Sequence, residues 1–400
     1  MAVSYSVKQL NKNHVLLIFD MVLLSVLASC ESSITENTAI KRHINIDSLI
    51  VCKTMDELPY NVRFVKLETS ADCVLGDIKK IETDGTNIFI EDFKERVFRF
   101  DKEGRFLNKI GSKGGATSEY ISLFDFCLDN KNQTVCMMDA SKGKLLRYDY
   151  NGKFILSQDV GMELMSGAVG MTLVNENDMI AINCNGPGEV NQYSLINLHE
   201  ATSEHILPYA IIGEYRSVQE NGKTAQNSSY TYALSFLSDT IYSYSDGKLA
   251  GEFLFQPKEP HFEGKYVKGK TFHTCYDAEN FIINQSVSAG IKSLYATDNY
   301  LFFTYTTKEN YYRVFFNSAT DKGYIYDVRK NLEDVGNIVW NNVMTSTNQY
   351  FVGVMPIGEY LSNEELKEKY PAFSELLSSS GISDNPIITF IEIQQEFPHE

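Results

Sequence analysis

The chain contains the same hairpin twice, as Phe100-Asp101-Lys102-Glu103-Gly104-Arg105-Phe106 and as Tyr148-Asp149-Tyr150-Asn151-Gly152-Lys153-Phe154. The equivalent aromatic, aspartate and glycine positions lie 48 residues apart. In each copy an apolar strand ends in Asp, a tight turn follows, and a second strand begins. Glycine supplies the positive φ that such a turn requires. An internal repeat of this length, built from short strands, predicts a repeated β-sheet unit.

Outward from these hairpins, each repeat extends to four strands joined by short turns. The first unit covers about 81–107 and the second about 126–155, and looser copies follow at 171–198, 235–248 and 294–316. A sixth unit would join the apolar runs 349–355 and 387–393 to a strand from the N-terminal region. Four-strand meanders that recur every ~40–50 residues are typical of propeller blades. We therefore predict an all-β fold, a six-bladed β-propeller of four-stranded antiparallel blades.

One segment near the C-terminus has a helical pattern. Ser362-Asn363-Glu364-Glu365 fits a capping box and predicts a helix with Ser362 as its N-cap. Pro371 interrupts this helix, and a second helix can run from there to Gly381. We predict a small helical insertion in the last blade, at about 362–380. It would pack against the blade, or act as a lid that binds a partner.

The N-terminal region has the pattern of an export signal. Lys8 and Lys12 precede an apolar run over 15–28 that is interrupted by Asp20. A membrane-spanning helix needs ~20 apolar residues, so this run is too short for one. The run ends in Leu27-Ala28-Ser29-Cys30, which resembles the lipobox of bacterial lipoproteins and implies a lipid on Cys30. An ordinary signal peptide followed by a chance cysteine is the alternative.

These patterns divide the chain into a lipoprotein signal peptide over 1–29, a tether over 30–42 and the propeller over 43–400. We expect a protein of the cell envelope that is lipid-anchored to the outer membrane. Whether it faces the periplasm or the cell surface is left open.

Composition excludes several classes of protein. Hydrophobic residues make up 43% and charged residues 22%, which is typical of a globular chain and not of a disordered one. Lys and Arg number 36 against 52 Asp and Glu, and the net charge of -16 argues against a nucleic-acid partner.

The cysteines show no CxxC and no Cys/His zinc spacing, so we expect no metal and no cofactor. The six cysteines other than Cys30 are predicted to be buried free thiols, with a Cys127–Cys136 bridge as the alternative.

The sequence resembles a known family in several segments. These are Val65-Lys66-Leu67-Glu68-Thr69, Leu75-Gly76-Asp77-Ile78, the run from Phe100 to Gly111, Leu237-Ser238-Asp239-Thr240-Ile241-Tyr242 and Asn385-Pro386-Ile387-Ile388. They are similar to the six-bladed β-propeller lipoproteins of Gram-negative gut bacteria, which are themselves similar to NHL-type propellers. The resemblance spans roughly Ile44 to Ile393. It weakens after Gly111, where the family has a Gly-Pro-Gly-Glu-Tyr run and this chain keeps only Glu119-Tyr120. The resemblance implies the fold and the lipid anchor, but no shared activity.

The sequence contains no catalytic signature such as HExxH, GxSxG or a phosphate-binding loop. Asp92 and Asp139 end equivalent strands in successive repeats, and equivalent positions gather around the axis of a propeller. With Glu119, Tyr120 and Arg147 they are our candidate ligand-binding residues. The alternative is that each Asp accepts backbone N–H bonds in the turn that follows its strand.

We therefore expect a binding or scaffolding module for a glycan, a peptide or a membrane-protein partner, and more readily a non-enzyme than an enzyme. The alternative is a hydrolase or lyase that acts on carbohydrate or peptide in the central funnel. Acids clustered with His or a metal at the axis would favour that alternative, whereas an axis filled with apolar side chains would exclude it.

Overall fold

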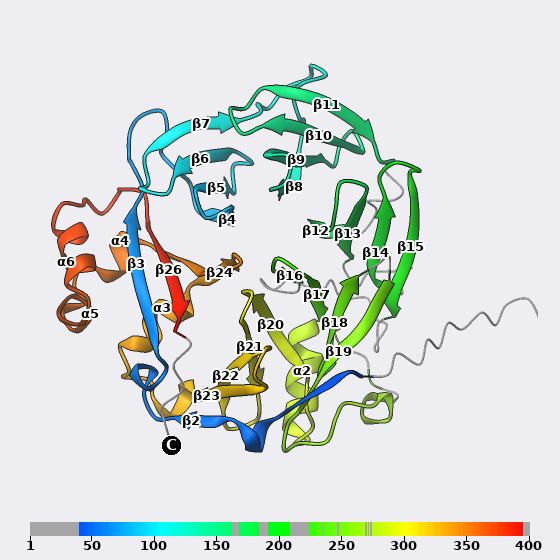
Figure 1. Cartoon of the computed structure of the whole chain (residues 1–400), viewed down its shortest axis with the longest axis vertical. Coiled ribbons are helices and arrows are strands. Elements are labelled where there is room, and N and C mark those ends of the chain that lie inside the picture. The colour runs from blue at the N-terminus through cyan, green and yellow to red at the C-terminus, as the bar shows by residue number, and fades with distance from the viewer. Residues whose placement is uncertain are drawn as a thin grey trace, which may run out of the picture. The chain divides into compact units, whose positions relative to one another are not determined.

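The computed structural model describes residues 40–161, 168–183, 191–208, 224–234, 236–245, 248–268, 270, 272 and 274–394. The predicted fold is confirmed. Six sheets of antiparallel strands surround a common axis as the blades of a β-propeller (Figure 1).

We number the blades in chain order and describe each from the axis outward. Blade 1 comprises β4 (Ile78–Thr83), β5 (Asn87–Asp92), β6 (Val97–Asp101) and β7 (Phe106–Ile110), and blade 2 comprises β8 (Leu123–Asp129), β9 (Thr134–Asp139), β10 (Lys144–Asp149) and β11 (Phe154–Asp159). Blade 3 comprises β12 (Ala168–Leu173), β13 (Asp178–Asn183), β14 (Asn191–Asn197) and β15 (Thr202–Pro208), and blade 4 comprises β16 (Thr224–Gln226), β17 (Thr231–Leu234), β18 (Thr240–Ser245) and β19 (Lys248–Gln256). Blade 5 comprises β20 (Ile291–Ala296), β21 (Tyr300–Thr306), β22 (Tyr311–Asn317) and β23 (Lys322–Asp327), and blade 6 comprises β24 (Val343–Ser346), β25 (Phe351–Met355), β26 (Ile387–Ile393) and β3 (Tyr60–Lys66).

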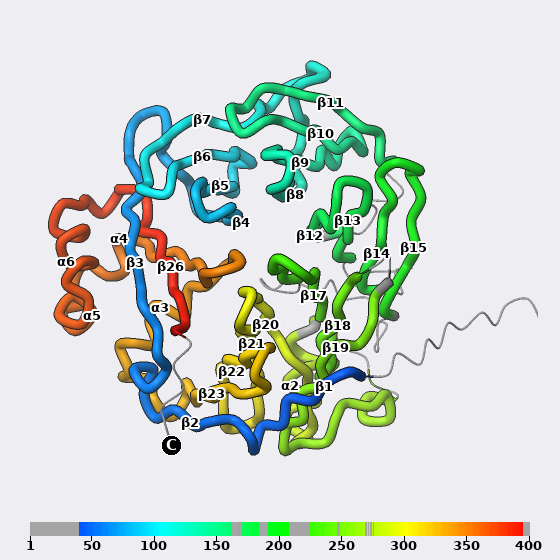
Figure 2. Tube along the Cα trace, in the orientation of Figure 1, coloured from blue at the N-terminus to red at the C-terminus, as the bar shows by residue number. Residues whose placement is uncertain are grey.

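The N-terminal part of the propeller closes the ring. Strand β3 pairs antiparallel with β26, as the sixth repeat predicts, and the two lie side by side in the trace of Figure 2. Two earlier strands extend other blades. Strand β1 (Arg42–Asn45) pairs parallel with β19, and β2 (Ile50–Cys52) pairs parallel with β23. The outer edges of blades 4 and 5 are therefore covered by the chain's own N-terminal segments.

The two hairpins of the repeat have the same local structure. The Asp101 and Asp149 N–H groups donate to Arg105 O and Lys153 O, each at 2.9 Å. Gly104 and Gly152 have φ of 84° and 80°, as the turn requires. The sequence repeat is thus a structural repeat.

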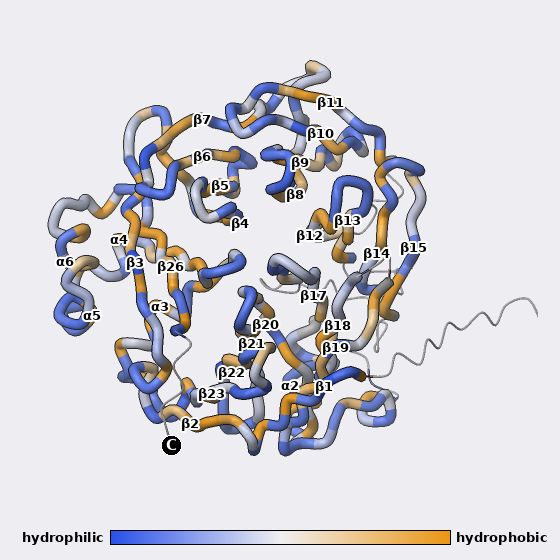
Figure 3. Tube along the Cα trace, in the orientation of Figure 1, coloured by the Kyte–Doolittle hydropathy of each residue, from blue (hydrophilic) through white to orange (hydrophobic). Residues whose placement is uncertain are grey.

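The hydrophobic core lies between neighbouring blades and contains most of the aromatic residues. Trp340 lies between blades 5 and 6, with its ring centroid 4.7 Å from Phe315, 5.4 Å from Phe302 and 5.7 Å from Phe351. Figure 3 shows hydrophobic residues along middle strands such as β14 and β26, and hydrophilic ones at the ends of β20 and β24 near the axis. Blade packing thus accounts for the aromatic content.

The cysteines within the described segments agree with the prediction of buried free thiols and not with the alternative of a disulfide bridge. Four are buried free thiols: Cys52, Cys73, Cys127 and Cys136. Cys127 and Cys136 are direct cross-strand partners in β8 and β9, but they form no disulfide. Cys30 and Cys184 lie outside the described residues, as does the side chain of Cys275.

Short helices lie between strands. Helices α4 (Ile357–Tyr360), α5 (Glu364–Lys369) and α6 (Pro371–Ser378) separate β25 from β26 and form the predicted insertion in blade 6. The prediction of the N-cap was wrong by one residue, because the side chain of Asn363, not Ser362, accepts from Leu366 N at 2.9 Å.

The remaining helices were not predicted. They are α2 (Cys275–Asn284), α3 (Gly336–Asn341) and four 3-10 turns, η1 (Ile46–Ser48), η2 (Met55–Glu57), η3 (Gly264–Val267) and η4 (Val328–Lys330). Within the described part of the chain, no helix is both long enough and apolar enough to cross a membrane.

Candidate functional site

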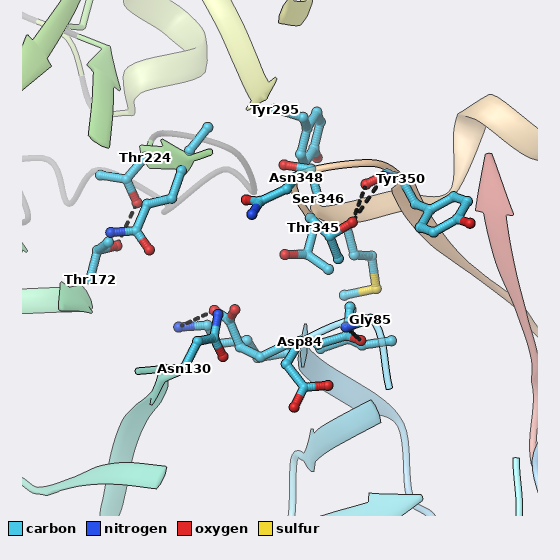
Figure 4. Close-up of a pocket in the computed structure, with 18 of the residues that line it drawn as sticks. Asp84, Gly85, Asn130, Thr172, Thr224, Tyr295, Thr345, Ser346, Asn348 and Tyr350 are labelled. Carbon is cyan, nitrogen blue, oxygen red and sulfur yellow. Dashed lines mark hydrogen bonds and ion pairs between the residues drawn. The ribbon is translucent and has the colours of Figure 1, made fainter. Parts of the chain in front are cut away.

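A polar cavity of about 1020 Å³ lies on the axis of the propeller. Its wall comes mainly from the first strand of every blade and from the turns that follow these strands (Figure 4). Neutral hydroxyl and amide side chains dominate this wall: Thr83, Thr86, Asn130, Thr172, Thr224, Gln226, Asn227, Thr345, Ser346, Thr347, Asn348 and Gln349. The axis is therefore not filled with apolar side chains.

A charged cluster lies on the blade 1 side of the cavity. The Nζ atom of Lys80 is 2.9 Å from Asp125 Oδ1 and 3.3 Å from Glu82 Oε1, and it donates to Phe126 O at 2.7 Å. Burial by itself would lower the pKa of Lys80, but the carboxylates of Asp125 and Glu82 raise it above its usual value. Burial raises the pKa of Glu82. Lys80 is thus a permanent cation held between two acids.

Asp125 also connects three blades. Its Oδ1 accepts from Lys80 of blade 1, and its Oδ2 accepts from the backbone N–H of Met171 in blade 3 at 2.7 Å. Similar contacts continue around the axis, with Thr172 and Thr224 hydroxyls 2.8 Å apart between blades 3 and 4. These hydrogen bonds between blades hold the wall of the cavity in place before any ligand arrives.

The turns at one end of the cavity share a side-chain cap. Asp84 Oδ1 accepts from Thr86 N at 2.8 Å, Asn227 Oδ1 from Ser229 N at 2.9 Å, and Thr347 Oγ1 from Gln349 N at 3.2 Å. Such caps fix a tight turn through a short polar side chain. The polar residues that follow in each turn are therefore presented at the rim on a rigid backbone.

The side chains of Thr345 and Asn348 have no hydrogen-bond partner among the described residues, and Figure 4 shows both on the blade 6 side of the cavity. Both can donate and accept hydrogen bonds. They are the groups of the wall best placed to bind a polar ligand.

Behind the wall lies Glu91, whose side chain is fully buried at the end of β5. Its Oε1 accepts from Lys79 Nζ at 2.7 Å, and its Oε2 has no hydrogen-bond partner. Burial raises its pKa to about 7. The protonated form is therefore favoured in the folded protein up to neutral pH.

Glu91 is expected to make folding stability fall as pH rises. Because its folded pKa lies above its unfolded value, the native state holds the extra proton between about pH 4.5 and 7, and stability is lost over that window. We expect Glu91→Gln to flatten this slope and to stabilise the protein at pH 8 by about 2 kcal/mol. Urea denaturation from pH 4.5 to 8 measures both effects. An unchanged slope in the variant would contradict the buried neutral carboxyl.

The structure places the predicted residues Asp92 and Asp139 at equivalent strand ends, both fully buried. Asp92 accepts from the backbone N–H groups of Gly76, Lys94 and Arg96 at 3.0–3.1 Å. Asp139 accepts from Ile121 N at 2.8 Å and from Ser141 N at 3.0 Å. The contacts with Lys94, Arg96 and Ser141 are the turn contacts that the sequence offered as the alternative, and those with Gly76 and Ile121 come from the segments before β4 and β8.

The other three predicted residues make contacts within the loops or between strands. Glu119 accepts from Ala116 N at 2.9 Å, the Tyr120 hydroxyl donates to Glu95 O at 2.6 Å, and Arg147 pairs with Asp129 at 3.3 Å. None of the five predicted residues belongs to the wall of the cavity. Their role in ligand binding stays a prediction, and Cys30 lies outside the described residues.

Sequence reasoning missed the residues that do line the cavity, above all Lys79, Lys80, Glu82 and Asp125. A local signal exists in blade 1, because its first strand, β4, carries four polar residues. Strand β4 reads IKKIET, whereas β9 reads TVCMMD. In the described segments, no group of three or more His, Cys, Asp or Glu could hold a metal ion.

A comparison with protein families gives a match to the family described as "Domain of unknown function (DUF4934)" over residues 42–392. The chain belongs to the DUF4934 family. A solved structure of a putative exported protein from Bacteroides fragilis NCTC 9343 is similar to this DUF4934 chain, with 18% identity and a TM-score of 0.67. The similarity covers 88% of this chain and 100% of that one, and at this identity it supports the fold alone.

A member of the DUF4221 family from Bacteroides vulgatus ATCC 8482 has 10% identity and a TM-score of 0.47, over 84% of this DUF4934 chain and 99% of its own. No curated protein matches the sequence.

Proposed function

We propose that this chain is an exported binding module that holds a neutral, polar ligand, a glycan segment, in its central cavity. The observation that carries the proposal is the wall of hydroxyl and amide side chains contributed by the blades around the axis. Such groups provide both donors and acceptors, as the hydroxyls of a sugar require.

The charges of the cavity support a neutral ligand. Four cationic side chains (Arg63, Lys79, Lys80 and Lys102) face four acidic ones (Glu82, Asp84, Glu103 and Asp125). The innermost of these charges pair with one another, as in the Lys80–Asp125 contact at 2.9 Å. A strongly charged ligand would have to break these pairs, whereas a neutral one can bind beside them.

The location of the protein is part of the proposal. The sequence pattern before Cys30 supports export and a lipid anchor, and the similar Bacteroides fragilis structure is named as an exported protein. A binding module tethered to the outer membrane would meet glycans, peptides or membrane-protein partners there. Recovery of the lipid-modified Cys30 peptide by mass spectrometry tests the anchor.

Binding of neutral oligosaccharides by the purified protein tests the ligand. We expect Thr345→Val combined with Asn348→Ala to weaken binding at least about tenfold in calorimetry, because each lost hydrogen bond is worth ~0.5–1.5 kcal/mol. Thr320→Val is the matched control, since Thr320 is exposed and does not line the cavity. Binding of peptides in place of sugars would contradict the glycan, and sugar binding unaffected by the double variant would contradict the cavity.

A further inference from the structure

The outer edges of the blades differ in how they are protected. The chain covers the outer edges of blades 4 and 5 with β1 and β2, whereas no described strand pairs with the outer edges of β7, β11 and β15. An open edge presents unpaired N–H and C=O groups to another chain, and charged residues or proline commonly prevent such pairing. Lys109 in β7 and Glu204 in β15 provide this protection.

Strand β11 has such a charge only at its last residue, Asp159. Its first five residues, Phe154-Ile155-Leu156-Ser157-Gln158, contain no charge and no proline. Ile155 is 48% and Leu156 41% exposed, although both are large and apolar. The pairing with β10 shifts by one residue at Ile155, and this bulge leaves both side chains on the outside. The outer edge of β11, which lies at the periphery in Figure 1, is therefore apolar and open in the part of the chain that the structure describes.

Opposite charges flank this apolar stretch. Lys153 precedes β11 and Asp159 ends it, and both are exposed. Neither has an ion-pair partner among the described residues. The backbone N–H of Lys153 donates to Asp149 Oδ1 at 2.9 Å, and the backbone N–H of Gly161 donates to Asp159 Oδ1 at 3.0 Å. An edge with a cation at one end and an anion at the other is complementary to its own antiparallel copy.

We propose that β11 is a self-association edge, through which two copies of the chain pair antiparallel about a two-fold axis at Leu156. In this arrangement Lys153 of each copy lies opposite Asp159 of the other, Leu156 meets Leu156 on the axis, and Ile155 lies opposite Ser157 beside it. The attraction is local and works against the repulsion between two chains of net charge -16. The contact is therefore expected to be weak and to form at high local concentration, such as on a membrane.

Sedimentation velocity of the purified full chain over a concentration series tests the proposal. We expect a monomer–dimer equilibrium in the parent protein and monomers at all concentrations in Leu156→Lys, which places two ammonium groups face to face. Leu107→Lys is the matched control, because Leu107 is the exposed residue at the equivalent bulge of β7. All variants keep the same N-terminal segment, so association through that segment is common to them.

A charge exchange tests the register. Lys153→Asp and Asp159→Lys alone should each weaken dimerisation about tenfold, because two symmetry-related attractive pairs become repulsive. The double variant should restore the parent dimer. The proposal is overturned if the parent protein stays monomeric, if the double variant does not recover, or if Leu107→Lys acts like Leu156→Lys.

Discussion

Gly152→Ala is expected to destabilise the protein by about 3–4 kcal/mol. Its φ of 80° costs a residue with a side chain ~1–2 kcal/mol. A Cβ at this position would also lie 2.5 Å from Lys109 O, on the outer strand of the preceding blade. Backbone atoms cannot move aside cheaply, so overpacking adds ~1–3 kcal/mol. Gly104 has a similar φ of 84°, and a Cβ at this position would contact Lys66 O of blade 6. Gly104→Ala should therefore lower the stability by a similar amount.

Gly85→Ala is the matched control for this prediction. Gly85 has φ of 87°, but nothing lies within 4 Å of the position of its Cβ. Its substitution should cost only the ~1–2 kcal/mol of the backbone conformation. Urea denaturation of the three variants separates the two contributions. Equal losses of stability in Gly85→Ala and Gly152→Ala would show that the contact between blades adds nothing to the destabilisation.

These glycines explain why the sequence predicts the fold so well. The D-x-x-G hairpin is required locally for its turn and again for the contact between blades, so it is retained in blades 1 and 2 with the same spacing. Blade 4 begins with a strand of only three residues, β16, and its repeat is correspondingly weak in the sequence. Strands β1 and β2 were not predicted, because their pairing with β19 and β23 depends on edges more than 200 residues away.

The cavity was harder to predict than the fold, for a physical reason. Asp92 and Asp139 are conspicuous because they end apolar strands, but a strand-end Asp satisfies backbone N–H groups of the adjacent turn. The cavity instead collects polar side chains from six separate strands, four from β4 and one or two from each of the others. No single segment has enough of them to form a motif. Helix α2 was missed although Thr274 and Asp277 form a capping box, because the surrounding insertion is polar and aromatic without a clear period.

Among substitutions at the cavity, Lys80→Met should have the largest effect. It should lower the free energy of unfolding by about 3 kcal/mol at pH 7. Met keeps the length of the side chain but removes the ammonium group that contacts Asp125, Glu82 and Phe126 O. Two acids that are mostly shielded from water then face each other without a cation, and removal of one partner of a buried pair typically costs ~3–5 kcal/mol. Lys102→Met is the control, because Lys102 also lines the cavity but is exposed and pairs only with exposed Glu103.

The loss of folding stability in Lys80→Met should depend on pH. Burial already raises the pKa of Glu82 in the folded protein, and Lys80 opposes this shift. Without the cation, the pKa of Glu82 rises further above its unfolded value, so the native state gains protons relative to the unfolded state. The stability of the variant should therefore decrease as pH rises, and the loss relative to the parent protein should be smaller at pH 4.5 than at pH 8. Adding Glu82→Gln should recover part of the loss at pH 8, because it removes one of the two facing charges. An equal loss at both pH values would show that Lys80 acts by packing alone and that the cavity wall does not depend on this charge cluster.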